Sequence, residues 1–290
     1  MNHPAALPHS ARTTLILCVI LAAYACARIL EIAPTSIPRI AVVALDVLSA
    51  LAFALVDGAR NYRLRGILVF AGICIVVGNI TENLSILTGF PFGHYYFAEL
   101  MGPKLFQVPV LLGLAYIGMA YVSLILACLI VGKSAPPAAT SRLLPVPLVA
   151  SFIMVAWDLA QDPVWATALH GWVWRDGGPW FGVPVSNYLG WYGTVFVVYL
   201  LFAIYMRRGS AQVVPAHGRA AILFYALCAA GNVGQIFSRP NLAVVQDPTG
   251  HAWRVADITA ASALVSIFGM GAFAVVAWIR LNQQQTAATD

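Results

Sequence analysis

Residues 108–132 read VPVLLGLAYIGMAYVSLILACLIVG, a run of 25 residues without one charged side chain. A helix needs about 20 consecutive apolar residues to cross the hydrocarbon core of a bilayer. The run is also too long and too evenly apolar for a strand, which would be shorter and would alternate between apolar and polar positions. We therefore interpret this stretch as a transmembrane helix.

The composition of the whole chain agrees with this interpretation. Hydrophobic residues make up 61% of the 290 residues, charged residues make up 9%, and the mean hydropathy is +0.82. Soluble domains carry roughly 25% charged residues, and so few charges could not cover the surface of a soluble protein. These values exclude a soluble enzyme, a disordered chain and a nucleic-acid-binding protein, and they make the lipid bilayer the expected surroundings.

By the same criterion the sequence holds about eight spans, and a count of seven to nine is compatible with the pattern. Pro34 and Pro38 separate the first two spans, because proline interrupts a helix. The expected spans are 14–33, 38–57, 66–87, 108–132, 144–165, 187–206, 218–237 and 256–280. The predicted fold class is all-α: a polytopic transmembrane helix bundle.

We expect residues 1–290 to form a single integral membrane domain. Residues 1–11 and 281–290 are predicted to be flexible ends, and 133–147 to be a proline-rich cytoplasmic linker. The first span also suits a signal peptide, because Arg12 precedes an apolar stretch with several alanines.

The distribution of Lys and Arg predicts the orientation. One set of segments, which includes both termini, carries ten basic residues, and the opposite set carries five. Cytoplasmic segments of membrane proteins are enriched in Lys and Arg. We therefore expect a multi-pass protein of the cell (inner) membrane with both termini in the cytoplasm. The opposite, outer loops are longer and richer in Trp, Gly and Pro, so we expect the functional site near the outer face.

Two carboxylates at the end of the fifth span are the leading candidates for chemistry, because charged groups inside a membrane are costly. Asp158 and Asp162 lie in the segment AWDLAQDP, and their i, i+4 spacing places them on one helix face. They would repel each other if both were ionised, so one is expected to hold a proton. A protonated carboxylic acid in an apolar pocket is suited to general acid catalysis. Alternatively, Asp162 starts a solvated turn before Pro163.

A second polar group lies in the third span, where Glu82 and Asn83 follow Asn79 by about one helical turn. These side chains could instead form hydrogen bonds that hold the helices together. Asp46 and Arg28 also lie within spans, and Arg28 is a candidate counter-ion for the acids.

Aromatic residues gather around the outer loops. They fit either an interfacial belt or a slot whose π-faces stabilise a cation. This cluster comprises Tyr95, Tyr96, Trp157, Trp165, Trp172, Trp174, Trp180, Tyr188 and Trp191. Three histidines lie in the same loops, but no two have a helical i, i+3 or i, i+4 spacing, so we predict no metal site.

Two blocks of sequence resemble the carotenoid-biosynthesis membrane family, which includes carotenoid 1,2-hydratases and bisanhydrobacterioruberin hydratases. Residues 82–110, ENLSILTGFPFGHYYFAELMGPKLFQVPV, are similar to its block with a Glu, then T-G-x-P-F-G-x-Y-x-Y and L-G-P-K-L-x-x-V-P. Residues 156–191, AWDLAQDPVWATALHGWVWRDGGPWFGVPVSNYLGW, are similar to its second block, W-D-L-x-x-D-P, G-x-W-x-W and G-V-P-x-x-N-x-x-G-W. The sequence departs from the pattern at Ser85, Phe97, Gly113, Tyr116 and Gln161.

The resemblance implies a cofactor-independent hydratase that adds water to the terminal 1,2 double bond of an acyclic carotenoid. It places Asp158 as the acid, with Asp162 or Glu82 positioning water. The expected substrate-binding residues are Asn83, Tyr95, Trp157, Trp172, Trp174, Asn187 and Trp191. The expected partners are a hydrophobic carotenoid or isoprenoid substrate, the bilayer, and other enzymes of the carotenoid pathway.

Three alternatives stay open at this point. The same protonation with water excluded would close a ring, as in a lycopene-type cyclase. The spacing of Asp158 and Asp162 is also similar to half of the diphosphate–Mg²⁺ site of an intramembrane prenyltransferase. Finally, Glu82 and Asp158 could form a proton relay in a transporter, or the protein could be a carotenoid-binding scaffold.

Overall fold

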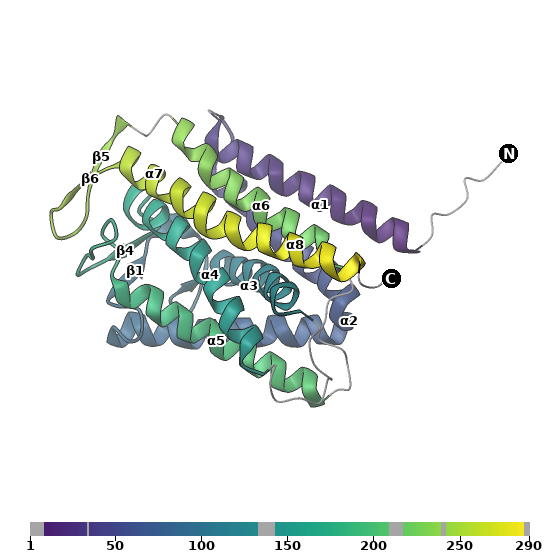
Figure 1. The fold of residues 1–290 in the computed structure, drawn as a ribbon. Coiled ribbons are helices and arrows are strands. Elements are labelled where there is room, and N and C mark those ends of the chain that lie inside the picture. The colour runs from purple at the N-terminus through teal and green to yellow at the C-terminus, as the bar shows by residue number, and fades with distance from the viewer. Residues whose placement is uncertain (1–8, 34, 133–142, 209–216, 239–241, 287–290) are drawn as a thin grey trace.

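The structure is a computed structural model that describes residues 9–33, 35–132, 143–208, 217–238 and 242–286. Long helices lie side by side and form one bundle (Figure 1). Helix α1 (His9–Ile32) begins, and helix α8 (Gly271–Thr286) ends, at the same end of this bundle. The labelled short strands gather at the other end, which we call the strand end (Figure 1).

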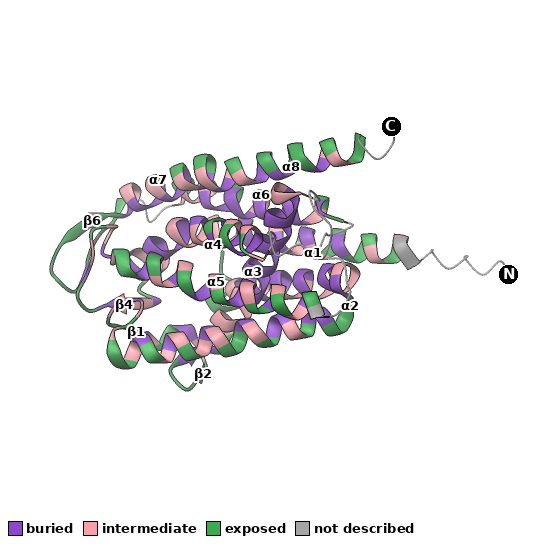
Figure 2. Cartoon of the chain, turned by 60° about the horizontal axis from the view of Figure 1, so that its bottom comes forward, coloured by how far each residue is buried: buried purple, intermediate pink, exposed green. Residues whose placement is uncertain are grey.

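Helix α3 (Val110–Val131) occupies the middle of the bundle. Every residue from Ile117 to Leu129 is buried, as expected for a helix that is apolar on all sides. Figure 2 shows the buried residues around α3 and the exposed ones on the outward faces of the surrounding helices. Gly118 allows close packing against α2, because a Cβ atom there would lie 2.7 Å from that of Ala50.

Helix α2 (Arg39–Thr88) contains two of the expected spans. Its helical geometry is interrupted at Arg63, with φ 59° and ψ 162°. The chain turns back there, because a Cβ atom on Gly58 would meet the side chain of Ile67 at 2.5 Å. In a straight helix these two residues would be about 13 Å apart along the axis. The two halves of α2 therefore form two neighbouring crossings.

The remaining spans follow in sequence. They are α4 (Pro145–Pro163) with the π-helical turn η3 (Val164–Ala168), α5 (Val185–Arg208), α6 (Arg219–Gly234) with η4 (Gln235–Phe237), and α7 (Val255–Val265) continued by η6 (Ser266–Met270) into α8. Six helices of the described chain are long and apolar enough to cross a membrane, and α2 is one of them. This confirms the all-α transmembrane fold class. The expected spans are helical, and α4 is the one of their helices that is not among these six.

Short strands, which the hydropathy pattern did not predict, order the loops of the strand end. β1 (Tyr95–Phe97) pairs antiparallel with β4 (Trp172–Trp174), and β5 (Val244–Gln246) pairs with β6 (Ala252–Arg254). After the 3₁₀ turn η1 (Glu99–Met101), β2 (Lys104–Leu105) pairs with β3 (Val108–Pro109). Runs of two or three residues are too short for a periodic pattern to identify.

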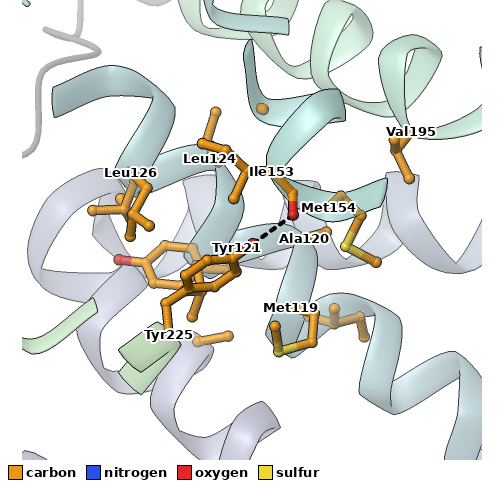
Figure 3. Close-up of a cluster of buried hydrophobic side chains, with 14 of the residues drawn as sticks. Met119, Ala120, Tyr121, Leu124, Leu126, Ile153, Met154, Val195 and Tyr225 are labelled. Carbon is orange, nitrogen blue, oxygen red and sulfur yellow. Dashed lines mark hydrogen bonds between the residues drawn. The ribbon is translucent and has the colours of Figure 1, made fainter. Parts of the chain in front are cut away.

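Tyrosine hydroxyls that reach helix carbonyls join the central helices. Tyr225 of α6 donates to the carbonyl of Ile153 in α4 at 2.7 Å (Figure 3). Tyr199 of α5 donates to the carbonyl of Ala120 in α3 at 3.1 Å. A buried hydroxyl needs such a partner, so these bonds fix the order of the helices around α3.

The helices extend into the ranges expected to be flexible or linking. α1 starts at His9 and α8 continues to Thr286, while α4 starts at Pro145 within the predicted linker. The rest of these ranges, residues 1–8, 133–142 and 287–290, lies outside the described residues.

Candidate functional site

Among the described residues, five carboxylates line one cavity inside the bundle, and three of them come from the second half of α2 and from α4. Glu82 comes from the second half of α2, and Asp158 and Asp162 come from α4. The cavity has a volume of about 100 Å³. Glu82 and Asp162 are each only 2% exposed. The structure thus brings together the three acids that the sequence singled out as catalytic.

Asp162 accepts a hydrogen bond on each of its two oxygens. The indole nitrogen of Trp172 donates to Oδ1 at 2.5 Å, and the amide of Asn187 donates to Oδ2 at 2.6 Å. The same amide lies 3.3 Å from Oδ2 of Asp158. Two short hydrogen bonds favour the ionised form of Asp162 more than one long contact favours that of Asp158.

Glu82 is also held by two donors. Tyr116 of α3 donates to Oε1 at 2.6 Å, and the hydroxyl of Tyr95 in β1 donates to Oε2. Both tyrosines line the cavity with Glu82. This pattern, like that of Asp162, favours the charged carboxylate.

The pairing of β1 with β4 joins the two blocks of sequence at the cavity. Tyr95 lies opposite Trp174, with ring centroids 4.6 Å apart, and Phe97 lies opposite Trp172. Ser85 supports this loop, because its hydroxyl accepts the N–H of Phe92 at 3.1 Å. Residues almost eighty positions apart therefore build one wall of the site.

Aromatic and aliphatic side chains together form the remaining wall. Trp191 of α5 lies edge-on to Tyr116 with ring centroids 4.5 Å apart, and Trp165 stacks on Trp172 at 6.3 Å. The predicted site residues that line the cavity are Glu82, Tyr95, Trp157, Asp158, Asp162, Trp172, Trp174, Asn187 and Trp191. Aromatic rings attract a positive charge over their faces, so a wall that holds several rings beside carboxylates suits a cationic guest.

Asn83 is the predicted site residue that the structure places elsewhere. Its side-chain amide donates to the carbonyl of Asn79 at 2.8 Å, and its oxygen accepts the backbone N–H of Gln107 at 3.2 Å. Asn83 precedes the loop but is not among the described residues that line the cavity. In this position it ties α2 to the loop before α3.

Sequence reasoning missed part of the site. Tyr116 and Gln161 were noted only as departures from the family pattern, yet both line the cavity. Arg28 and Asp46 also line it, with Arg28 Nη1 2.7 Å from Glu31 Oε2 and 3.7 Å from Asp46 Oδ1.

The histidines of the loops do not converge. His94 pairs with Asp176 at 2.9 Å on the exposed surface, whereas His251 contacts the ring of Trp253 in β6. Within the described ranges, no group of three or more His, Cys, Asp and Glu side chains is placed to hold a metal ion.

The fold and site together define a membrane-helix protein with buried carboxylates in an aromatic chamber. Residues 39–239, well over half of the 290, match the carotenoid biosynthesis protein family, and the chain belongs to that family. It is also similar to bisanhydrobacterioruberin hydratase from Haloarcula japonica, with 32% identity over 122 residues. That match covers 42% of this chain and 39% of the relative, so the chain spans well under half the length of the relative it matches. No solved structure matches the chain.

Family membership and the name of this relative support a role in modifying carotenoids. The site is compatible with that role, because its walls are apolar and aromatic while its few polar groups converge. Such a chamber can bind a hydrocarbon chain and still deliver a proton to it.

Proposed function

We propose that the protein adds water to the terminal 1,2 double bond of an acyclic carotenoid end, through a tertiary carbocation. The observation that carries this proposal is the meeting of Glu82, Asp158 and Asp162 in one aromatic chamber. The three carboxylates have different hydrogen-bond donors around them. Carboxyl groups in different surroundings can act one as an acid and another as an anion. The family and the hydratase name of the relative support the choice of a carotenoid as substrate and of hydration as the reaction.

Asp158 is the proton donor in this proposal. A trisubstituted alkene is a weak base, so the proton must come from a well-placed acid with little solvent around it. Asp158 has only the 3.3 Å contact with Asn187, while its neighbour Asp162 has two short donors. Because two anions one turn apart repel each other, the acid with fewer donors keeps the proton.

Glu82 and Asp162 stabilise the cation that protonation creates. In this proposal both react as anions, and because their hydrogen-bond donors are fixed they need no reorganisation as the positive charge develops. The rings of Trp157, Trp174 and Trp191 present their faces or edges to the same cavity, and cation–π attraction adds to the stabilisation.

Water then completes the reaction. The oxygen of a water molecule bonds to the cationic carbon, and the surplus proton passes to the carboxylate of Asp158, which had become ionised in the first step. The product is a tertiary alcohol and the acid is restored. No step needs an oxidant, a reductant or a cofactor.

The location suits an apolar polyene that is already dissolved in the bilayer. We propose lateral entry from lipid, with the cavity near the outer face, both termini in the cytoplasm and the protein in the inner membrane. Other enzymes of the carotenoid pathway are the proposed partners, because they would supply the substrate or use the alcohol.

Expression in a host that accumulates lycopene tests the proposal. Mass analysis of the pigments is expected to show a product heavier than lycopene by one water molecule. The Asp158→Asn variant should lose this product, whereas Glu99→Gln should keep it, because the Glu99 side chain is 98% exposed. A product of unchanged mass would indicate a cyclase, and full activity of Asp158→Asn would overturn the assignment of the acid.

A further inference from the structure

A second polar cluster lines the same cavity as the three carboxylates. Arg28 of α1, Asp46 of α2 and Gln161 of α4 all contribute to its wall. Asn232 of α6 lies behind them, and its Oδ1 accepts from Arg28 Nη2 at 2.6 Å and from Gln161 Nε2 at 2.7 Å. Two side chains from distant parts of the sequence, Arg28 and Gln161, are thus tied to one asparagine, and Asp46 lies 3.7 Å from the guanidinium of Arg28.

The orientation of these groups is fixed from outside the cavity. The amide nitrogen of Asn232 donates to the hydroxyl of Ser266 in η6 at 3.0 Å, so its oxygen must face Arg28 and Gln161. The amide nitrogen of Gln161 is thereby taken, which leaves its oxygen for another partner. Such a chain of hydrogen bonds holds a polar group in one position.

Three atoms of the cluster are buried and have no hydrogen-bond partner among the described residues. They are Arg28 Nε, which is a donor, and Asp46 Oδ1 and Gln161 Oε1, which are acceptors. Arg28 and Gln161 are only 5% and 6% exposed. Buried polar groups without partners are costly, so these atoms point to a ligand that both accepts and donates hydrogen bonds.

The charge of the cluster favours a neutral ligand. Arg28 is already compensated by Glu31 at 2.7 Å and by Asp46 at 3.7 Å. An anion would meet the two acids, and a cation would meet the guanidinium. A water molecule satisfies one donor and two acceptors without adding charge, whereas the hydroxyl of an alcohol can donate to only one of the two acceptors.

The position of Gln161 brings this ligand to the same helix face as Asp158. Gln161 is three residues after Asp158 on α4, and side chains three apart are neighbours on a helix face, with Cβ atoms about 5–6 Å apart. A second cavity of about 380 Å³ shares Glu31, Val43 and Trp165 with the first. It is partly lined by polar side chains such as Thr35 and Arg39, which offers a path for water.

We propose that Arg28, Asp46 and Gln161 form a hydroxyl-binding subsite that holds the water molecule which captures the carbocation. This inference rests on the proposed hydration. The oxygen of the water molecule held in the subsite bonds to the cationic carbon, one O–H bond of that water breaks, and the proton passes to the carboxylate of Asp158. The subsite therefore decides between capture by water and loss of a proton back to the alkene.

The test uses membranes that contain the full chain, with lycopene as the substrate in deuterium oxide. A cation that is captured gives the alcohol, whereas one that escapes capture loses a proton and returns deuterium-labelled lycopene. In the Gln161→Met variant, which keeps the size of the side chain, we expect the ratio of alcohol to labelled lycopene to fall by about tenfold, the effect of one lost hydrogen bond. The sum of the two products should change little.

Ser151→Ala is the matched control, because Ser151 is also buried in α4 but bonds to the carbonyl of Pro147. It should keep the wild-type ratio. If Gln161→Met yields no folded protein, the same ratio is measured for Asp46→Asn, and again a fall supports the subsite while a wild-type ratio overturns it.

The outcomes separate this inference from the proposed function. A wild-type ratio in Gln161→Met overturns the subsite and leaves hydration intact. Altered selectivity between lycopene and a hydroxylated carotenoid, at an unchanged ratio, would mean that the subsite binds a hydroxyl of the substrate, and it would overturn the assignment of water. If the wild-type protein forms neither alcohol nor labelled lycopene, the proposed function itself is wrong.

Discussion

Replacing Glu82 by glutamine removes one negative charge from the cavity and changes little else. The carboxylate is 2% exposed and accepts from the hydroxyls of Tyr95 and Tyr116. A glutamine has the same shape, and a tyrosine hydroxyl can accept from its amide nitrogen as well as donate to its oxygen. We therefore expect Glu82→Gln to fold with nearly the wild-type thermal stability.

The loss of the charge should lower the rate of hydration. A carboxylate about 4 Å from a positive charge stabilises it by about 4 kcal/mol at an effective dielectric constant of 20. Since about 1.4 kcal/mol in the barrier is tenfold in rate, we expect Glu82→Gln to slow the formation of alcohol by about a thousandfold.

The assay measures the rate of alcohol formation from lycopene in membranes, together with the melting temperature of the purified variant. Glu99→Gln is the matched control, because it removes the same charge from an exposed position of the strand end. A Glu82→Gln variant that hydrates at the wild-type rate would refute the electrostatic role. A variant that loses rate and melting temperature together would show that Glu82 serves the fold.

Three further predictions concern parts of the chain outside the cavity. Arg63 has φ 59° and ψ 162°, a region that suits glycine, so Arg63→Gly should raise the melting temperature, whereas Arg65→Gly within the helix should lower stability by about 1 kcal/mol. Tyr121→Phe removes the 2.7 Å hydrogen bond to the buried carboxylate of Asp57, and it should cost about 1–3 kcal/mol of stability, read from thermal unfolding, without changing the ratio of products. Partial burial would raise the pKa of Asp247, but hydrogen bonds from the threonine and tryptophan side chains of its loop outweigh burial and lower the pKa. The loop should therefore loosen only as the pH falls through this lowered pKa, which tryptophan fluorescence would report. The Asp247→Asn variant should lack this pH-dependent change in fluorescence.

The spans of this protein could be predicted because a run of about twenty consecutive apolar residues indicates a membrane-spanning helix. The charge-free run that became α3 is the clearest case, since its burial on all sides follows from its uniform composition. The turn at Arg63 could not be seen in the same way, because it occupies a single residue with an unusual backbone geometry. Hydropathy separated the two halves of α2 only through the basic residues between them.

The carboxylates of the site could be predicted as well, because an ionisable side chain within an apolar span is energetically costly and therefore rare. Their partners could not. Tyr116 is one tyrosine in a helix of apolar residues, and its value comes from the 2.6 Å contact with Glu82, which is 34 positions away. Likewise, nothing near Gln161 in the sequence indicates that Asn232 will hold its amide. Contacts between distant helices depend on how the bundle packs.

The most direct test of the central claim follows the proton from Asp158 to carbon. Wild-type protein in membranes is incubated with lycopene in deuterium oxide. The alcohol is then equilibrated with ordinary water, so that its O–D group becomes O–H, and is analysed by mass spectrometry. Protonation by Asp158, whose proton exchanges with deuterium oxide between turnovers, predicts deuterium bound to carbon beside the new hydroxyl group. It also predicts that Asp158→Asn forms neither the alcohol nor labelled lycopene. An alcohol without carbon-bound deuterium, or wild-type labelling in Asp158→Asn, would contradict the account.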